Sequence, residues 1–265
     1  MRGLALVTAG FSVALAAAVP EEATARTATS AGAGPGEGML LVARGAARGE
    51  PLPVAGTQVA AHVAGFAAQV KVRQAFNNPF DRPLEAVYIF PLPHEAAVSH
   101  VEVAIGDRRI KSEIKTRAEA SEIFARARRE GRTAAILEQE RPNVFTQSVT
   151  AIPPGQVVKV EIVYDVPLAY DAGAYEFVYP MVVGPRYVPG TPTGKPPSGA
   201  GTAPDTDQVP DGSRITPPTL PAGRRSGRNI TLEVAIDPGK RIRTIDSPTH
   251  AIAVDRDEES TAVVV

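Results

Sequence analysis

Glu138 and Glu140 are the residues whose type and spacing come nearest to catalytic chemistry in this sequence. They stand two apart within "LEQERPNVFTQSVTAIPPG", which spans residues 137–155. On a β-strand, side chains two apart share one face and lie about 7 Å from each other. That separation suits the acid and base carboxylates of an inverting glycosidase. A secreted glycoside hydrolase that uses Glu138 and Glu140 is therefore one hypothesis for the function.

The composition argues against a sugar-binding cleft around these two carboxylates. Aromatic residues make up 5% of the chain and there is no tryptophan, whereas sugar sites need a cleft with aromatic surfaces for stacking. Glutamates that lie close to arginines most often form ordinary ion pairs. We therefore interpret Glu138 and Glu140 as partners of neighbouring arginines and predict that the chain is not an enzyme.

Three further strings imitate known sites and fail on inspection. "HEAAVSH" at 94–100 lacks the second histidine at i+4 that a zinc-binding helix requires, and "GTPTGKPP" at 190–197 lacks the spacing of a phosphate loop. "DTDQVPDG" at 205–212 has Val209 where a calcium loop needs an oxygen ligand, so we expect a solvated acidic loop. We predict no catalytic, cofactor-binding or metal-binding residues and no cofactor.

The charge and the cysteine count exclude two classes of partner and site. The formal net charge is -1, so no overall positive field attracts a phosphate backbone and we expect no nucleic-acid partner. The chain contains no cysteine, which excludes disulfides and thiolate metal ligands.

The amino terminus predicts export. Arg2 precedes an apolar run from Gly3 to Val19, and Ala23-Thr24-Ala25 has the small-residue pattern of a cleavage site. We assign residues 1–25 to a signal peptide and 26–38 to a flexible linker. The protein is then secreted, periplasmic or on the cell surface, and it contacts a membrane only if the signal segment stays uncleaved.

Alternation of apolar and polar residues predicts strands in the rest of the chain. Apolar residues recur at every second position around 70–76, 101–105, 158–166 and 230–236, with charged residues between them. This pattern is typical of half-solvated antiparallel strands. Two sheets must cover each other's apolar faces, so we predict an all-β-dominated fold, an antiparallel β-sandwich.

One helix and one long loop interrupt the strands. Residues 117–130 carry an apolar stripe at helical spacing, Thr116 and Glu119 form a capping box before it, and Gly131 follows its end. We predict an inserted amphipathic helix there. Residues 188–228 are rich in proline and glycine without apolar periodicity, and we predict a long irregular loop.

The segments from "VKVRQAFNNPFDRPLEAVYIFPLPHEAAVSH" through "LEQERPNVFTQSVTAIPPGQVVKVEIVY" to "YEFVYPMVVGPRYVPG" resemble the VIT domain, the vault protein inter-alpha-trypsin module. "RITPP" at 214–218 and "SPTH" at 247–250 are similar to later landmarks of that family. We assign residues 39–265 to such a domain. Ala151 departs from the family, which usually has asparagine before Ile-Pro-Pro-Gly, so a side-chain hydrogen bond to that turn is expected to be missing.

The resemblance implies a β-sandwich with an inserted helix and without established catalytic residues. Such domains usually precede a von Willebrand A domain in adhesion and scaffold proteins, among them proteins of the inter-alpha-trypsin inhibitor heavy chain type. Together with the predicted signal peptide, the resemblance implies an exported interaction module with a protein partner and a von Willebrand A domain downstream in the same polypeptide. "ERPNVFTQSVTAIPPG" is then a structural signature, in which Phe145 and Val149 fill the core and Pro153-Pro154-Gly155 reverses the chain.

Overall fold

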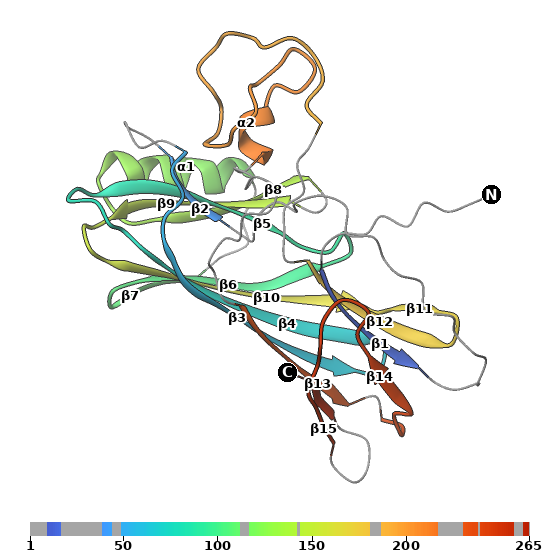
Figure 1. Ribbon diagram of the computed structural model, residues 1–265. Helices are drawn as coiled ribbons and strands as arrows, with labels where there is room; N and C mark the ends of the chain where they lie inside the picture. The colour runs from blue at the N-terminus through green and yellow to red at the C-terminus, as the bar shows by residue number, and fades with distance from the viewer. Residues whose placement is uncertain are drawn as a thin grey trace.

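The computed structural model describes residues 10–16, 39–43, 49–111, 117–141, 144–180, 187–216, 230–237, 239–256 and 262–264. Strands dominate these residues and are arranged in layers, with one long helix at the side of the small sheet described below (Figure 1). The predicted all-β-dominated fold with a single inserted amphipathic helix is confirmed.

The largest sheet has eight strands and contains all four of the predicted alternating segments. Its strand order is β15-β16-β13-β3-β4-β10-β6-β7. The strands are β3 (Val54–Ala64), β4 (Ala67–Asn77), β6 (Ala97–Ile105), β7 (Arg108–Lys111), β10 (Val157–Pro167), β13 (Ile230–Asp237), β15 (Val254–Arg256) and β16 (Ala262–Val264). Buried and exposed residues alternate along β3 and β4, so one face of this sheet meets solvent.

Two four-stranded sheets accompany the large one. The small sheet has the order β2-β5-β9-β8, with β2 (Met39–Val42), β5 (Leu84–Pro91), β9 (Val144–Ile152) and β8 (Ala135–Arg141). The third sheet has the order β11-β12-β1-β14, with β11 (Ala169–Asp171), β12 (Ala174–Pro180), β1 (Gly10–Ala16) and β14 (Thr244–Asp246). β1 lies within the predicted signal peptide, and that assignment stays a prediction.

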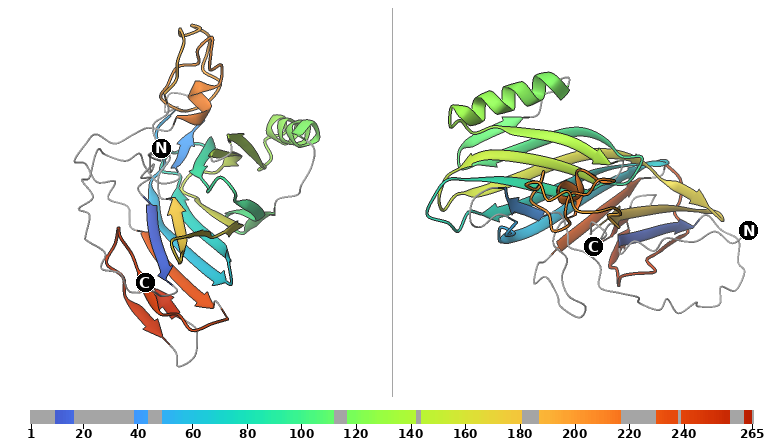
Figure 2. Two further views of the ribbon diagram at one scale, coloured as in Figure 1. Left: turned by 90° about the vertical axis from the view of Figure 1, so that its right-hand side faces the viewer. Right: turned by 90° about the horizontal axis from the view of Figure 1, so that it is seen from above.

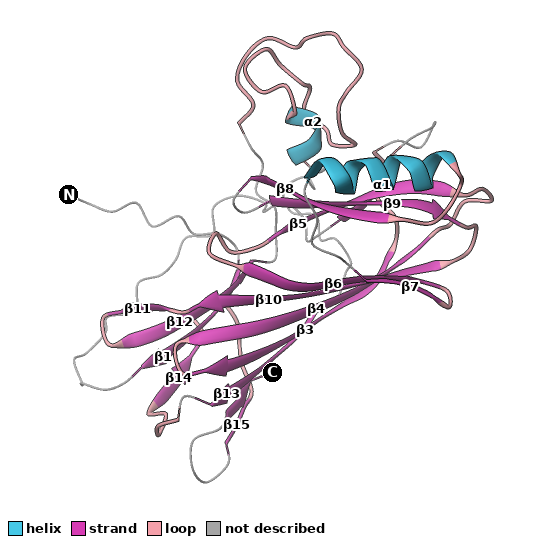
Figure 3. Cartoon of the chain, turned by 180° about the vertical axis from the view of Figure 1, so that it is seen from behind, coloured by secondary structure: helices cyan, strands magenta, loops and turns pink. Residues whose placement is uncertain are grey.

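A single apolar core lies between the large and small sheets and continues under the third. Phe145 and Val149 of β9 are both buried in it, as predicted, opposite the inward residues of β4, β6 and β10. Phe177 and Tyr179 of β12 extend the same core toward the third sheet. Figure 3 shows the small sheet as a layer above the larger one.

The expectation that every alternating strand pairs antiparallel is wrong for β13. β13 pairs parallel with β3, with Ile230 opposite Thr57 and Asp237 opposite Ala64. Its residues still alternate between buried and accessible positions because the outer face of the large sheet is solvated. The alternation reports which face is buried and does not report strand direction.

The predicted helix is α1 (Arg117–Arg129), which lies beside β8 (Figure 2). Arg126, Arg128 and Arg129 fall in its last turn, where the helix dipole favours positive charge. Gly131 follows with a φ of 66°, the left-handed conformation expected of a helix terminator. Thr116, the expected capping residue, lies outside the described residues.

The small sheet is buried on both of its faces. Tyr88, Ile89 and Phe90 of β5 are all buried although they are consecutive, so their side chains point alternately to opposite faces. Tyr88 and Phe90 join the main core, and Ile89 joins a second cluster with Leu41. The second cluster also contains Ala200 and Ile215, which belong to the long loop rather than to a strand.

A chain of aromatic rings and one polar link connect the two sheets through the core. The rings of Phe76, Tyr88, Phe90 and Phe145 follow one another with centroids 5.6, 4.8 and 5.7 Å apart. The Tyr88 hydroxyl donates to Gln74 Oε1 on β4, and Gln74 Nε2 donates to Thr57 Oγ1 at 2.7 Å. Burial of these polar groups is tolerated because each of them has a partner.

Buried Asn78 joins two turns at the end of the sandwich. Its Nδ2 donates to the carbonyls of Ile152 and Pro153 at 3.1 and 2.9 Å, and its Oδ1 accepts from the Phe80 N–H at 3.0 Å. The Gly155 N–H donates to the Asn78 carbonyl at 3.0 Å. The Pro-Pro-Gly reversal predicted from the sequence is confirmed, and this asparagine ties it to the turn after β4.

We expect Asn78→Ala to lower the free energy of unfolding by about 2 kcal/mol, because buried carbonyls lose their donor. Asn77→Ala is the matched control: Asn77 is exposed, and surface substitutions change stability by about 0.5 kcal/mol or less. Urea denaturation of both variants measures the difference. Equal stabilities for the two variants would contradict the linking role of Asn78.

Ala151 adopts a backbone conformation that alanine disfavours. Its φ is 50°, and it lies in a bulge where the pairing of β5 with β9 shifts between Leu84 and Ala86. Asparagine tolerates this left-handed region better than alanine. An asparagine, which the resemblance leads us to expect at this position, would therefore have a conformational reason in addition to any hydrogen bond.

We expect Ala151→Asn to raise the free energy of unfolding by about 0.5 kcal/mol through relief of this backbone cost. Ala64→Asn, at an exposed strand position without a positive φ, should give no gain. Paired thermal melts test this, and an Ala151→Asn protein that melts at or below the parent temperature counts against the explanation.

Candidate functional site

Glu138 and Glu140 meet a single arginine from the long loop. Arg214 Nη2 donates to Glu138 Oε2 at 3.0 Å, and Arg214 Nε donates to Glu140 Oε1 at 3.1 Å. Arg214 Nη2 also forms an ion pair with Glu140 Oε1, and Thr146 Oγ1 donates to the same oxygen at 2.6 Å. Both carboxylates of the predicted pair are therefore engaged in holding one guanidinium.

The pairing of β8 with β9 and the position of the loop bring Glu138, Glu140 and Arg214 together. Glu138 lies opposite Thr146 in the pairing of β8 with β9, and a shift in register follows between Gln139 and Arg141. Arg214 comes from α2 (Gly212–Ile215), a single helical turn packed by Ile215 onto the second apolar cluster. Burial alone lowers the pKa of Arg214, but the hydrogen bonds and charges of Glu140 and Glu138 raise it above its usual range.

This geometry suits an ion-pair clamp better than a catalytic pair. We use the name clamp for Glu138 and Glu140 together with the Arg214 guanidinium that they hold. The side chain of Glu140 is 7% exposed and that of Glu138 is 20% exposed. In a glycosidase, space between the carboxylates receives the substrate and a water molecule, whereas here Arg214 lies against both of them. The interpretation of these glutamates as ion-pair partners is consistent with the structure, although the arginine is remote in sequence rather than a neighbour.

The loop that carries Arg214 has its own internal hydrogen bonds. Asp205 Oδ1 accepts from the Ser213 N–H at 2.7 Å and Asp205 Oδ2 accepts from the Ser198 N–H at 2.6 Å. Thr206 Oγ1 donates to the Pro189 carbonyl at 2.6 Å. The expectation of a solvated acidic loop is wrong for Asp205, which is buried, because its carboxylate satisfies two backbone amides.

Close packing confirms that residues 187–216 form a defined structure. A Cβ on Gly199 would lie 2.5 Å from the Ser213 carbonyl oxygen, and one on Gly201 would lie 2.3 Å from the Thr216 carbonyl oxygen. Glycine is required at both positions because the two arms of the loop approach so closely. The part of the predicted loop 188–228 that the structure describes is irregular and folded back on itself (Figure 1).

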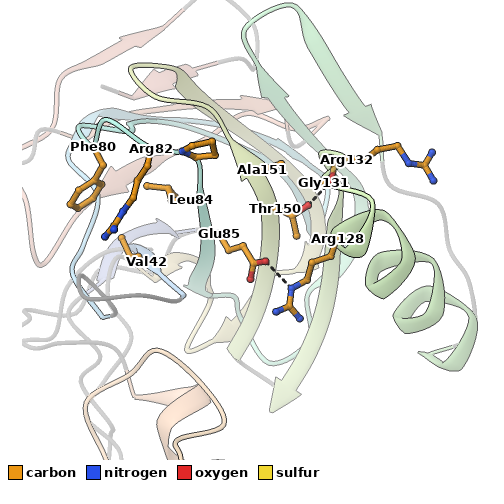
Figure 4. Close-up of a pocket in the computed structure, with 11 residues that line it drawn as sticks. Val42, Phe80, Arg82, Leu84, Glu85, Arg128, Gly131, Arg132, Thr150 and Ala151 are labelled. Atoms are coloured by element: carbon orange, nitrogen blue, oxygen red, sulfur yellow. Dashed lines mark hydrogen bonds and ion pairs between the residues drawn. The ribbon is translucent and has the colours of Figure 1, made fainter.

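A second junction joins α1 to the small sheet. Arg128 Nε donates to Glu85 Oε1 at 2.7 Å, and Thr150 Oγ1 donates to the Arg132 carbonyl at 2.9 Å (Figure 4). These residues line a shallow pocket of about 390 Å³ together with Phe80 and Leu84. Glu85 and Arg128 neutralise each other in this pocket, and the Thr150 hydroxyl is engaged with the Arg132 carbonyl.

The histidine and acidic strings form no metal site within the part of the chain that the structure describes. His94 lies in the turn before β6 and His100 lies within β6, and neither is joined by two further ligands among the described residues. Within the residues that the structure describes, no three histidine or acidic side chains stand close enough to hold a metal ion. Over the same residues, no helix has the length and apolar character needed to cross a membrane.

The family profile for the vault protein inter-alpha-trypsin domain matches residues 54–164. Residues 54–164 form a VIT domain. The match runs from the start of β3 into β10 and includes α1 and the two turns tied by Asn78. The assignment of the wider range 39–265 to the domain stays a prediction, because the matched range ends at Tyr164.

Curated relatives contain the same domain within much longer chains. Protein mono-ADP-ribosyltransferase PARP4 of Mus musculus is 36% identical over 139 residues, which cover 52% of this chain and 7% of that protein. Human von Willebrand factor A domain-containing protein 5A is 31% identical over 142 residues, which cover 52% of this chain and 18% of that protein. This chain therefore corresponds to a small part of each relative.

Solved structures align more loosely. An M1 zinc metallopeptidase from Deinococcus radiodurans superposes with a TM-score of 0.31 at 12% identity, covering 86% of this chain and 39% of the peptidase. A TM-score this low supports no argument about function.

Sequence reasoning missed the two residues that organise this site, Arg214 and Asp205. Arg214 follows "VPDGS" in a stretch without periodicity. Its carboxylate partners Glu140 and Glu138 lie 74 and 76 residues earlier in the chain. Asp205 begins the imperfect calcium loop at 205–212, a pattern that does not predict its burial. The one signal available was Arg214 itself, the only arginine in the glycine-rich and proline-rich segment 187–216.

We expect Arg214→Met to destabilise the protein by about 2 kcal/mol, somewhat less than a fully buried ion pair because Arg214 keeps contact with solvent. Two glutamates would then face each other without a cation. Arg73→Met is the control: its exposed pair with Glu161 contributes about 0.5 kcal/mol or less. Hydrogen exchange should accelerate in residues 187–216 only in Arg214→Met, and unchanged exchange there contradicts the clamp.

We also expect the loop to lose stability in acid. Burial tends to raise the pKa of Asp205, but hydrogen bonds from Ser213 and Ser198 outweigh it, so the folded pKa lies below the unfolded value. The stability that the Asp205 carboxylate gives the folded state is therefore present above about pH 4 and is lost as pH falls through the folded pKa. Asp205→Asn should remove about 1 kcal/mol at pH 7 and nothing near pH 2, whereas exposed Asp171→Asn should be neutral at both.

Proposed function

We propose that this chain is an exported, non-catalytic interaction module whose VIT domain presents the loop 187–216 to a partner protein. The observation that supports this most directly is the clamp: Glu138 and Glu140 bind Arg214 and hold a long, exposed loop in one conformation. Loops positioned by a rigid scaffold are the usual location of binding residues. A loop ordered before binding also loses less conformational entropy on association.

The outer surface of the loop fits a protein partner. Tyr187 at its start is 89% exposed, and tyrosine is among the residues enriched at protein interfaces. Exposed threonine, lysine and proline residues follow through residues 191–198. This surface offers an aromatic anchor and a polar rim rather than a cleft for a small substrate.

Export and a neighbouring domain are the remaining parts of the proposal. The signal peptide at residues 1–25 would release a mature chain that begins after Ala25, outside the cell or at its surface. The name of the von Willebrand factor A domain-containing relative supports a von Willebrand A domain following in the same polypeptide. Metal-dependent adhesion would then lie in that domain, and the coding sequence downstream of Val265 tests its presence.

The glycoside hydrolase alternative has no specific observation in its favour. Its carboxylates would need space for a sugar, and they contact Arg214 and Thr146 instead. Incubation of the purified chain with a panel of chromogenic glycosides tests this alternative. Hydrolysis that is lost in a Glu138→Gln, Glu140→Gln double variant would overturn the non-catalytic proposal.

We expect site-specific photocrosslinking in the native host to identify the partner. Benzoylphenylalanine at Tyr187 should give a light-dependent adduct of defined mass with one protein. The same group at Tyr170, which is 62% exposed, should not, because its strand β11 lies at the other end of the molecule from the loop (Figure 1). Adducts of equal yield at both positions, or none at Tyr187, would count against the loop as the binding surface.

A further inference from the structure

A cavity of about 630 Å³ lies at the open side of the sandwich, between α1 and the edges of the two main sheets. In the left view of Figure 2, α1 is seen end-on beside the small sheet. β6 and β7 of the large sheet line one side of the cavity, β8 and β9 of the small sheet line the other, and α1 covers part of the opening. Its volume is in the range of small-ligand pockets.

The walls of this cavity are mainly apolar. The apolar side chains come from β6, β7, α1 and β8. They are Val98, Val101, Ile110, Ile123, Phe124 and Leu137. Ile123 is 41% exposed although it belongs to the apolar stripe of α1. The helix therefore does not seal the apolar interior, and part of its stripe remains available to a ligand.

Gln147 supplies a polar group inside the cavity that lacks a partner. It lies on β9 between Phe145 and Val149, which share its face and point into the core. Gln147 is 3% exposed, and its Oε1 is buried without a hydrogen bond. A buried acceptor without a donor is costly and uncommon in native proteins, so a bound donor would explain why this residue is not apolar.

Among the described residues that line the cavity, the ionisable side chains are basic and none is a carboxylate. They are Lys111 at the end of β7, Arg126 on α1 and Arg132 after it, with His100 on β6. Arg132 is already paired with Glu130, which leaves Lys111 and Arg126 to receive an anion. This local excess of positive charge contrasts with the net charge of -1 for the whole chain.

We propose that this cavity binds an amphiphilic carboxylate, a molecule with an acyl chain and one anionic head group. The chain lies among the apolar walls between the sheets, and the head group pairs with Lys111 and Arg126 at the opening. A hydroxyl near the far end of the chain donates to Gln147 Oε1. This binding site is separate from the loop 187–216 and does not depend on the proposed partner protein.

Isothermal titration calorimetry of the full chain tests the ligand class with three probes below their micellar concentrations. Dodecanoate should bind saturably with one molecule per chain, and dodecylammonium should bind at least tenfold more weakly because its head group is repelled. Omega-hydroxydodecanoate should bind severalfold more tightly than dodecanoate. Absence of dodecanoate binding, or equal affinity for the two head groups, overturns the proposal.

Four variants locate the site. Arg126→Glu should weaken dodecanoate binding at least tenfold, whereas Arg129→Glu should leave it unchanged, because Arg129 is exposed on the same helix and does not line the cavity. Ala120→Trp should block binding by filling the opening. Gln147→Leu should keep dodecanoate binding and abolish the preference for the hydroxylated chain.

A second measurement separates blocked binding from a damaged fold. Circular dichroism and thermal melting should show Ala120→Trp folded like the parent, and the side-chain amide resonance of Gln147 should shift when ligand binds to the parent protein. Tight binding by Arg126→Glu, or an unshifted Gln147 resonance in the saturated parent, would place the ligand elsewhere and overturn the assignment.

Discussion

The small sheet β2-β5-β9-β8 has apolar side chains on both faces, and this constraint determines much of the remaining structure. Its inner face is covered by the large sheet, which is the ordinary arrangement of a sandwich. Its outer face carries Leu41, Ile89 and Val144, which need a cover of their own. Residues of the long loop provide it, so this segment is part of the folded unit rather than an appendage.

Ion pairs fix the orientation of the loop 187–216 on the small sheet. Ala200 and Ile215 place the loop over the sheet, but apolar contact alone does not fix an orientation. The hydrogen bonds from the Arg214 guanidinium to Glu138 and Glu140 fix the orientation, because a guanidinium bonds to carboxylates in a restricted geometry. Two carboxylates that looked like a catalytic pair are thus better understood as the receiving half of a positioning contact.

Local patterns in the sequence were sufficient for four strands of the large sheet, β4, β6, β10 and β13, and for the helix α1. Val158, Val160 and Ile162 are buried in alternation with accessible residues, because burial on one face imposes a period of two. The parallel pairing of β13 with β3 could not be predicted, since direction depends on the path of the connection and not on alternation. The consecutive buried residues Tyr88, Ile89 and Phe90 did carry a signal, because a strand covered on both faces reads as a continuous apolar run.

The site was less predictable than the fold, for a physical reason. Glu138 and Glu140 were identified, but their partner Arg214 is brought to them by tertiary packing from a segment without periodicity. Asp205 was visible only as an acidic residue in a loop, and its role depends on two amide groups that the folded loop presents. Pairings between distant, irregular segments leave little trace in one sequence.

The placement of β13 beside β3 has a consequence for how the protein is made. β3 (Val54–Ala64) leaves the ribosome early, whereas its neighbour β13 (Ile230–Asp237) emerges near the end of synthesis. Until then the backbone of β3 has an open hydrogen-bonding edge, the kind of edge that pairs with other chains. The residues matched to the VIT domain therefore cannot complete their main sheet alone, and folding has to wait for a late, non-local contact, which is characteristically slow. A chaperone that shields this edge during synthesis would protect the chain at its most aggregation-prone stage.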